Sequence, residues 1–365
     1  MSLGTALRGL LGGDPPPDPT DHRLPRETVE LALRLLQQRG PRDEAELDAL
    51  RALSSPEALR AALMAPGAPS VQAAAAPYAA PLWLLAPPAS PRIPWRLEPP
   101  CLSHPVSQIC TAGQMEGPDY AGWCASFGEA PRQHRKQWEF CWILAVLQAA
   151  GMLRPGVRAL GFGTGREPIP SVLAAQGVEV LATDAPPDLD GTQGWDSTGQ
   201  HAAGLMALHH PAILDEATFR ARVSFRPVDM NAIPSDLAGF DACWSSCCFE
   251  HLGGIEAGLN FVENSLRTLR PGGVAVHTTE FNLGSNEETL ESPGLSLFRR
   301  RDIESLLDRL AGKGHRLWPL NLHPGDAPVD AHVDAPPYAL PHLKILAAEH
   351  ITTSIGLVVQ RAEAL

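Results

Sequence analysis

The sequence predicts an α/β fold: a Rossmann-like sheet of mostly parallel strands, covered by helices and preceded by a helical, Pro/Ala-rich extension. Three observations carry this prediction. From residue 155 onward, short apolar segments alternate with longer segments of helical periodicity. A glycine-rich turn follows the first apolar segment, and the last one lies near the C-terminus. The expected strands are residues 158–162, 178–183, 223–228, 240–245, 274–279, 315–320 and 354–360.

Two of the connecting segments have the periodicity of amphipathic helices. Residues 254–269 place apolar side chains at intervals of three and four, and Arg270-Pro271-Gly272-Gly273 is expected to end that helix. Residues 302–311 repeat the pattern, so one face of each helix would pack on the sheet. The apolar residues are Ile255, Leu259, Val262, Leu266 and Leu269 in the first helix, and Ile303, Leu306, Leu307 and Leu310 in the second.

The glycine-rich turn, Gly161-Phe162-Gly163-Thr164-Gly165, is the main indication of a bound ligand. Glycines let the backbone approach a cofactor closely, and a carboxylate at the end of the next strand, here Asp184, can hold the ribose hydroxyls. A dinucleotide fingerprint has its third glycine one position later, where this chain has Arg166. The spacing therefore disfavours a nicotinamide cofactor and is instead the pattern of S-adenosylmethionine (SAM) sites.

Three parts are expected along the chain. Residues 1–100 form a helical and Pro/Ala-rich extension, residues 101–152 a bridging helical segment, and residues 153–365 the cofactor-binding domain. The extension either packs on the main domain or gates a substrate site. Its helices are expected at residues 27–39, 43–53 and 56–64, whereas residues 65–100 contain too many prolines for regular structure.

The bridging segment contains one long expected helix, residues 133–152, with a wide apolar stripe. Its first turn, residues 134–138, is polar and aromatic. Such a turn is usually solvated beside a packed Trp. The alternative is that these residues contact a cofactor or a substrate.

The composition limits the class of partner. The chain has 365 residues, a formal net charge of −12 and 44% hydrophobic residues. An acidic protein lacks the basic stripe that a nucleic-acid backbone requires, so no nucleic-acid partner is expected. Seven cysteines without paired spacing favour a reduced, cytoplasmic setting and no metal site. Prolines at 77 and 81 interrupt the most apolar stretch, so no membrane span is expected.

From residue 155 to the C-terminus, the chain resembles the class I SAM-dependent methyltransferases. The resemblance lies in several short motifs that occur in the correct order and context, and it does not extend to residues 1–100. The motifs are the glycine-rich turn with Asp184, Val228-Asp229-Met230, Phe240-Asp241-Ala242-Cys243-Trp244-Ser245-Ser246, Glu250-His251-Leu252 and Leu269-Arg270-Pro271-Gly272-Gly273.

The resemblance implies a seven-stranded sheet, with six parallel strands and the last antiparallel, and SAM as the cofactor. The family usually has an acidic residue two positions before the first glycine, where this chain has Ala159. Glu167 is therefore expected to pair with the ammonium group of the methionine part instead. The other implied contacts are Gly161, Gly163 and Gly165 under the methionine part, Asp184 at the ribose, Asp229 and Met230 at the adenine, and Trp244 and Ser245 along the cofactor.

Methyl transfer to a hydroxyl requires a base, and the candidates follow the fourth and fifth strands. His251 and its neighbour Glu250 lie at a loop-to-helix position where related sequences often carry Glu-His. The alternative role for His251 is to hold that loop. Alternation along the fifth strand places His277 and Glu280 on opposite faces, and Glu280 is the better candidate because it lies at the strand end.

The expected function is methyl transfer to a small-molecule acceptor, through a hydroxyl of a sugar or another polar metabolite. Enzymes that methylate amide or nucleobase nitrogens have Asn or Asp, then Pro-Pro and an aromatic residue, after the fourth strand. This chain has Ser245-Ser246-Cys247-Cys248 there. The alternatives are a SAM-binding, methyltransferase-like interaction subunit without turnover and, less favoured, a nicotinamide-dependent enzyme.

Overall fold

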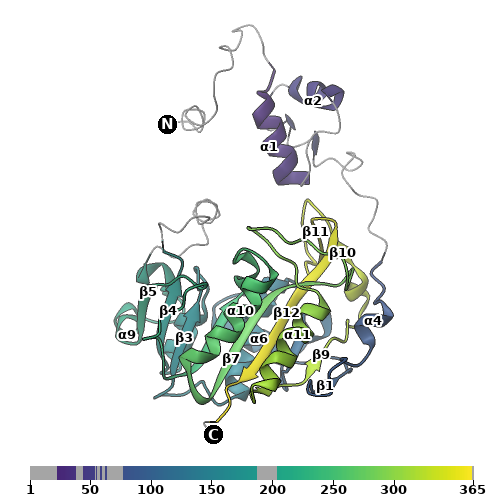
Figure 1. Ribbon diagram of the computed structural model, residues 1–365. Coiled ribbons are helices and arrows are strands. Elements are labelled where there is room, and N and C mark those ends of the chain that lie inside the picture. The colour runs from purple at the N-terminus through teal and green to yellow at the C-terminus, as the bar shows by residue number, and fades with distance from the viewer. Residues whose placement is uncertain are drawn as a thin grey trace. The chain divides into compact units, whose positions relative to one another are not determined.

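The computed structural model divides the chain into two compact units, Met1–Ala74 and Ala75–Leu365 (Figure 1). Within the described ranges, no helix combines the length and apolar character needed to cross a membrane. The described residues are 23–37, 44–53, 55, 58–59, 62–63, 77–186 and 204–363.

The first unit is a small helical structure with its own apolar core. Helix α1 (Arg26–Gln37) and helix α2 (Glu44–Arg51) confirm the first two expected helices. Residues 58–59 and 62–63 are helical where the third helix is expected. Each helix buries one face, as its periodicity requires. The buried side chains are Leu24, Val29, Leu33, Leu47, Leu59 and Leu63.

The second unit is built on one sheet of twelve strands (Figure 1). Seven strands match the expected set: β3 (Arg158–Phe162), β4 (Glu179–Asp184), β5 (Val223–Pro227), β6 (Phe240–Ser246), β7 (Leu269–Asn282), β8 (Arg316–Leu317) and β12 (His350–Gln360). Five run parallel in the order β5-β4-β3-β6-β7, and β12 lies antiparallel beside β7. Because β8 is antiparallel to β12, it runs parallel to β7. The expected fold, six parallel strands with the last strand antiparallel, is confirmed.

Five further strands bring the sheet from the expected seven to twelve. They are β1 (Trp95–Arg96), β2 (Ser107–Ile109), β9 (Leu320–Asn321), β10 (Val333–Asp334) and β11 (Lys344–Ala347). Strand β2 pairs with β12, and β9 and β1 follow it outward.

Two expectations about the sheet are therefore wrong. Residues 65–100 contain regular structure, namely β1 and helix α4 (Leu82–Leu85), and the expected strand at 315–320 is divided between β8 and β9. The strands concerned have only two residues, which is too few for a hydrophobic pattern to reveal.

The segment Arg270-Pro271-Gly272-Gly273 does not end a helix. Helix α10 (Ile255–Ser265) ends earlier and passes through one 3₁₀ turn, and β7 begins at Leu269. Backbone bonds from Gly272 N to Arg361 O and from Arg361 N to Gly273 O draw this segment into the strand.

Helices cover both faces of the sheet, so each face has its own apolar core. Along β7, Val274 and Val276 belong to one core, and Ala275 belongs to the other. One core is shared with α5 (Pro118–Ser126), α6 (Arg135–Ala149), α7 (Ile169–Ala175) and α9 (Glu216–Arg222), and the other with α4, α10 and α11 (Arg300–Gly312).

Helix α6 confirms the expected bridging helix. Its packing against the sheet fixes where its first turn lies. Trp142 packs against β12 at Gly356, where a Cβ would overlap the indole ring. At the start of the helix, Lys136 Nζ donates to Ser246 O at 3.0 Å, at the carboxyl end of β6. The polar first turn therefore lies where parallel strands present their ligand-binding ends.

Candidate functional site

The glycine-rich turn after β3 is packed by the loops that follow β5 and β6. Gly163 has a φ of +56°. A Cβ on this residue would lie 2.9 Å from Cys248 Sγ and 3.3 Å from Met230 Sδ. Both the left-handed φ and the lack of space therefore require glycine here. Met230 and Cys248 hold the turn between them.

Trp244 lies beneath this turn and not along an open groove. Its side chain is fully buried, and a Cβ on Gly161 would lie 2.5 Å from its Cζ2 atom. The indole Nε1 donates to Glu167 Oε1 at 2.6 Å. Because the ring is fully buried, a contact of Trp244 with a cofactor would have to involve its backbone or its neighbour Glu167, and this contact stays a prediction.

Glu167 is a buried carboxyl group at the end of the turn, with 7% of its surface exposed. Burial raises its pKa to about 8, against the opposing effects of the Trp244 hydrogen bond and the Lys136 charge. Glu167 is therefore largely protonated at pH 7. A positive group bound beside it would favour the carboxylate and lower this pKa.

The two other expected carboxylates follow the next strands of the same sheet edge. Asp184 ends β4, is 8% exposed, and accepts the Ala185 amide at 2.8 Å. Asp229 follows β5 and accepts the Asn231 amide at 2.8 Å. Because β5, β4, β3 and β6 are adjacent and parallel, these carboxylates, the glycine turn and Glu167 lie at one edge.

Ser245 and His277 belong to the protein interior. Ser245 Oγ lies 2.7 Å from His277 Nδ1, and Ser265 Oγ lies 2.9 Å from His277 Nε2. Burial lowers the pKa of His277 to about 3, so the ring stays neutral. Both ring nitrogens are engaged in the core, which excludes His277 as a base. The Ser245 hydroxyl therefore faces this core, and a contact of Ser245 with a cofactor, which would use its backbone, stays a prediction.

A second group of polar residues lies at the carboxyl ends of β6 and β7, around Glu139 of α6. We call it the α6 cluster: Arg135, Lys136, Glu139, Cys247, Glu250 and Glu280. Glu139 is fully buried. Burial opposes its charge, but Lys136 and Arg135 outweigh that effect and lower its pKa. Four further donors reach its carboxylate: Ser246 Oγ at 3.0 Å, Cys247 Sγ at 3.0 Å, Thr278 Oγ1 at 2.9 Å and Ser354 Oγ at 2.7 Å.

Glu280 lies on β7, two residues before the strand ends at Asn282, within this cluster. It forms an ion pair with Arg135 and accepts the Thr352 hydroxyl at 3.2 Å. Burial raises its pKa, the Arg135 guanidinium opposes the rise, and the Glu250 carboxylate adds to it. A carboxylate of raised basicity at a strand end is suited to accept a proton.

Cys247 and Glu250, on the turn after β6, complete the α6 cluster. Cys247 has a φ of +46°, which turns the chain sharply after β6, and burial keeps its thiol neutral by raising its pKa. Glu250 is 1% exposed and accepts the Thr279 hydroxyl at 2.9 Å. The ligand atoms of Cys247, Glu250 and Glu280 lie within 4.8 Å of one another. The Arg135 guanidinium supplies positive charge at this point, and we assign no ion to it.

His251 lies next to the α6 cluster, directly after Glu250. Its Nδ1 lies 2.6 Å from Gly294 O, and the backbone N–H of Ser296 donates to Glu250 O at 2.8 Å. These two contacts fasten the segment after β7 to the turn that carries Glu250 and His251. The geometry fits the alternative role of holding this loop.

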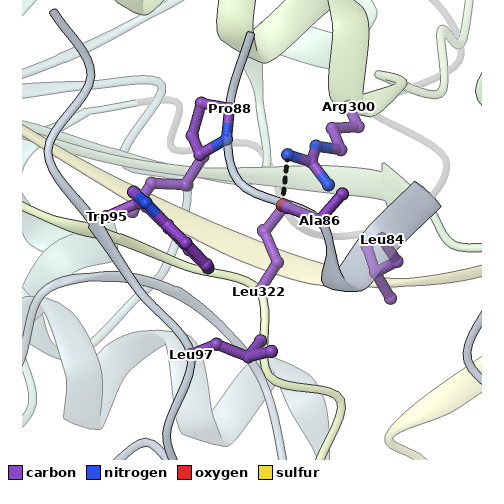
Figure 2. Close-up of a pocket in the computed structure, with 8 residues that line it drawn as sticks. Leu84, Ala86, Pro88, Trp95, Leu97, Arg300 and Leu322 are labelled. Atoms are coloured by element: carbon purple, nitrogen blue, oxygen red, sulfur yellow. Dashed lines mark hydrogen bonds between the residues drawn. The ribbon is translucent and has the colours of Figure 1, made fainter. Parts of the chain in front are cut away.

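The pocket drawn in Figure 2 is separate from both groups and shares no residue with them. There the Arg300 guanidinium donates to Ala86 O at 2.7 Å and fastens the segment after α4 to α11. The lining residues are Leu84, Ala86, Pro88, Trp95, Leu97, Arg300, Leu320 and Leu322.

The structure thus brings the expected residues together in two neighbouring groups, joined by the turn after β6. The polar first turn of α6 contributes Arg135 and Lys136, and a contact of residues 134–138 with a cofactor or a substrate stays a prediction. Sequence reasoning missed Glu139 and Cys247. The available signal was a charged residue within the apolar stripe of the helix, between Trp138 and Phe140.

Comparison with known proteins gives similarity in structure only. No protein-family model and no curated protein sequence matches the chain. It is similar to a Burkholderia thailandensis 1,6-didemethyltoxoflavin-N1-methyltransferase with bound S-adenosylhomocysteine (17% identity, 60% of this chain and 77% of that one, TM-score 0.34). It is also similar to the N-terminal domain of EvdMO1 with S-adenosylhomocysteine (16%, 60% and 79%, 0.37), and to the cyclase SpnF (16%, 61% and 83%, 0.38). Since one fold hosts many activities, function is argued from the residues above.

Replacing Glu139 tests whether the α6 cluster depends on this charge. Glu139→Gln leaves Lys136 and Arg135 without their shared partner. We expect the free energy of unfolding to fall by about 3–5 kcal/mol, as when one member of a buried ion pair is lost. All eight Trp residues lie in Ala75–Leu365, so Trp fluorescence during denaturation reports on that unit.

The pH dependence gives this prediction a sign. Because the folded pKa of Glu139 is lowered, its contribution is present above the unfolded pKa of about 4.3 and is lost as the pH falls. The difference in the free energy of unfolding between wild type and Glu139→Gln should therefore become smaller as the pH falls. The control is Glu216→Gln, which removes an exposed pair with Arg220. If Glu139→Gln lowered the free energy of unfolding at pH 7 no more than the control does, the α6 cluster would not depend on the Glu139 charge.

Proposed function

We propose that this chain is a SAM-dependent methyltransferase that acts on a small-molecule acceptor. The observation that carries the proposal is the convergence of a tightly packed glycine turn, Asp184, Asp229 and Glu167 at the carboxyl ends of four adjacent parallel strands. That arrangement suits a ligand with a ribose, an adenine ring and an amino-acid end. A cytoplasmic setting remains the expectation from the cysteines.

Each part of the cofactor has a residue suited to it. In this proposal the glycine turn lies under the methionine part, Asp184 holds the ribose hydroxyls, and Asp229 with the Met230 backbone recognises adenine. Glu167 holds the ammonium group. SAM supplies a methyl group on a positively charged sulfur, and the protein's part is to align the acceptor, exclude water and remove a proton.

In this proposal the α6 cluster binds the acceptor, and Glu280 accepts the proton of its hydroxyl group. Burial and the neighbouring Glu250 carboxylate support that role, because both make Glu280 a stronger base than an exposed carboxylate. The Thr352 hydroxyl, which donates to Glu280 at 3.2 Å, adds a polar group beside this carboxylate, which suits a polar acceptor. A hydroxyl of a sugar or a similar metabolite remains the proposed acceptor group. A silent SAM-binding subunit is the outcome to be separated from it.

Calorimetric titration with SAM, S-adenosylhomocysteine and NAD tests the cofactor. We expect micromolar binding of both sulfur ligands and none of NAD. Asp184→Ala should weaken SAM binding at least about tenfold, because hydrogen bonds to a carboxylate are worth roughly 1.5–3 kcal/mol. Asp236→Ala, which removes an exposed carboxylate paired with Arg226, is the control and should bind normally. Unchanged affinity in Asp184→Ala would refute the ribose assignment.

Proton release on binding tests Glu167. Its carboxyl is largely protonated at pH 7, and an ammonium group beside it should drive ionisation. Titration with SAM in phosphate and Tris buffers, whose ionisation enthalpies differ, should show release of nearly one proton. Glu167→Gln should abolish that release and weaken binding. If the variant releases the same number of protons, the ammonium lies elsewhere.

Turnover separates an enzyme from a silent subunit. A panel of sugars and other hydroxyl compounds would be scored by S-adenosylhomocysteine formation. On any acceptor found, Glu280→Gln should lower kcat about a hundredfold or more, with SAM affinity unchanged. His251→Ala should have a smaller effect if the ring only holds its loop. A larger loss in His251→Ala than in Glu280→Gln would make His251 the base instead.

A further inference from the structure

The Arg135 guanidinium is held within the α6 cluster by unequal contacts. Its side chain is 15% exposed, and Nη1 forms the ion pair with Glu280 and donates to Ser354 Oγ at 3.2 Å. The same atom lies 3.9 Å from Glu139 Oε1. Nε is buried and has no hydrogen-bond partner among the described residues. An arginine that served packing alone would be expected to satisfy this donor.

The backbone around Arg135 fixes where that guanidinium can lie. Arg135 is the first residue of α6, and its N–H donates to His342 O at 2.8 Å. His342 N in turn donates to Gln133 O at 2.8 Å. The His134 side chain caps the helix by accepting the Lys136 amide at 3.1 Å. The start of α6 is therefore fastened on both sides, and Arg135 extends from a fixed origin.

The polar and charged groups facing Glu280 come from three elements. The Glu139 carboxylate faces it from α6, Glu250 from the turn after β6, and the neutral Cys247 thiol from the same turn. From β12, Thr352 contributes only a hydroxyl group. Lys136 donates to Glu139 at 3.3 Å. Arg135 is thus the cation in direct contact with Glu280, opposing two carboxylates and burial.

We propose that Arg135 is a positioning residue for the methyl transfer: it holds the Glu280 carboxylate at the end of β7 and keeps it in the charged form that can take the acceptor's proton. The inference rests on the proposed function, and it assigns to α6 a part in the chemistry. Without the guanidinium, burial and the two other carboxylates would raise the pKa of Glu280 further and favour its protonated form.

The first test follows the protonation of Glu280 directly. Protein labelled with ¹³C at the glutamate carboxyl group is titrated by NMR, alone and with S-adenosylhomocysteine, and Glu280→Gln identifies the resonance. Arg135→Met keeps the length of the side chain and removes its charge. We expect it to raise the titration midpoint of Glu280 by more than about one pH unit. Arg135→Lys, which keeps a charge, should shift it less.

The matched control is Arg132→Met, three residues earlier. Arg132 is half exposed and pairs with Glu129, outside the α6 cluster. This variant should leave the Glu280 titration unchanged. If Arg135→Met is too unstable to study, Arg135→Gln, which also removes the charge, replaces it with the same expected rise in the Glu280 midpoint, and an unchanged midpoint would overturn the role of Arg135.

The second test uses an acceptor found in the panel and the pH profile of kcat. In Arg135→Met, activity should fall at neutral pH and recover as the pH is raised, because hydroxide restores the Glu280 carboxylate. In Glu280→Gln it should not recover. The KM for SAM should stay unchanged in both. A loss of packing alone would lower activity at every pH.

The outcomes separate the two proposals. If the wild-type protein binds neither SAM nor S-adenosylhomocysteine, the proposed function fails, whatever Arg135 does. If S-adenosylhomocysteine binds but the Glu280 midpoint is the same in Arg135→Met, Arg135→Lys and wild type, the role of Arg135 is overturned and the proposed function stands.

Discussion

The buried charge of Glu139 is the interaction on which the rest of the site depends. A carboxylate removed from water loses several kcal/mol of hydration, and only a complete set of donors and cations can offset that loss. Glu139 has such a set, drawn from α6, β7, β12 and the end of β6. Because its partners come from four elements, forming this one group of contacts aligns the start of α6 with β7, β12 and the end of β6.

The last residues of β6 and the turn that follows link the two halves of the site. Trp244 supports Glu167, and Ser245 faces the core at His277. Ser246 and Cys247 donate to Glu139, and Cys248 packs on Gly163. A short polar segment thereby serves the glycine turn and the α6 cluster together. A displacement of α6 would therefore be transmitted through Lys136 and Ser246 to the end of β6 and the glycine turn packed against it.

The sequence was sufficient for the parts of the fold that repeat a pattern. Alternating strands and helices, the glycine turn and Asp184 follow from spacing alone, because each is set by neighbours within about twenty residues. Glu139 could not be found that way, since Ser246 and Ser354 lie 107 and 215 residues further along the chain. The burial of the Trp244 and Ser245 side chains could not be predicted either, because the elements that cover the end of a strand are not evident from its own residues. The two-residue strands β1 and β9 carry no periodicity at all.

The positions of the two cations, Arg135 and Lys136, explain why the pKa values of the buried glutamates in the site are shifted in different directions. Arg135 and Lys136 both lie close to Glu139, and with its four other donors they keep it charged. Glu280 has Arg135 as its cation, and Glu167 has only the more distant charge of Lys136. Burial therefore has the larger effect on both carboxyl groups and raises the pKa of each. The carboxylate that organises the fold is therefore closed to ligands by its own partners. The two that retain raised pKa values lie on either side of it, one beside the glycine turn and one at the end of β7, where a proton can be exchanged.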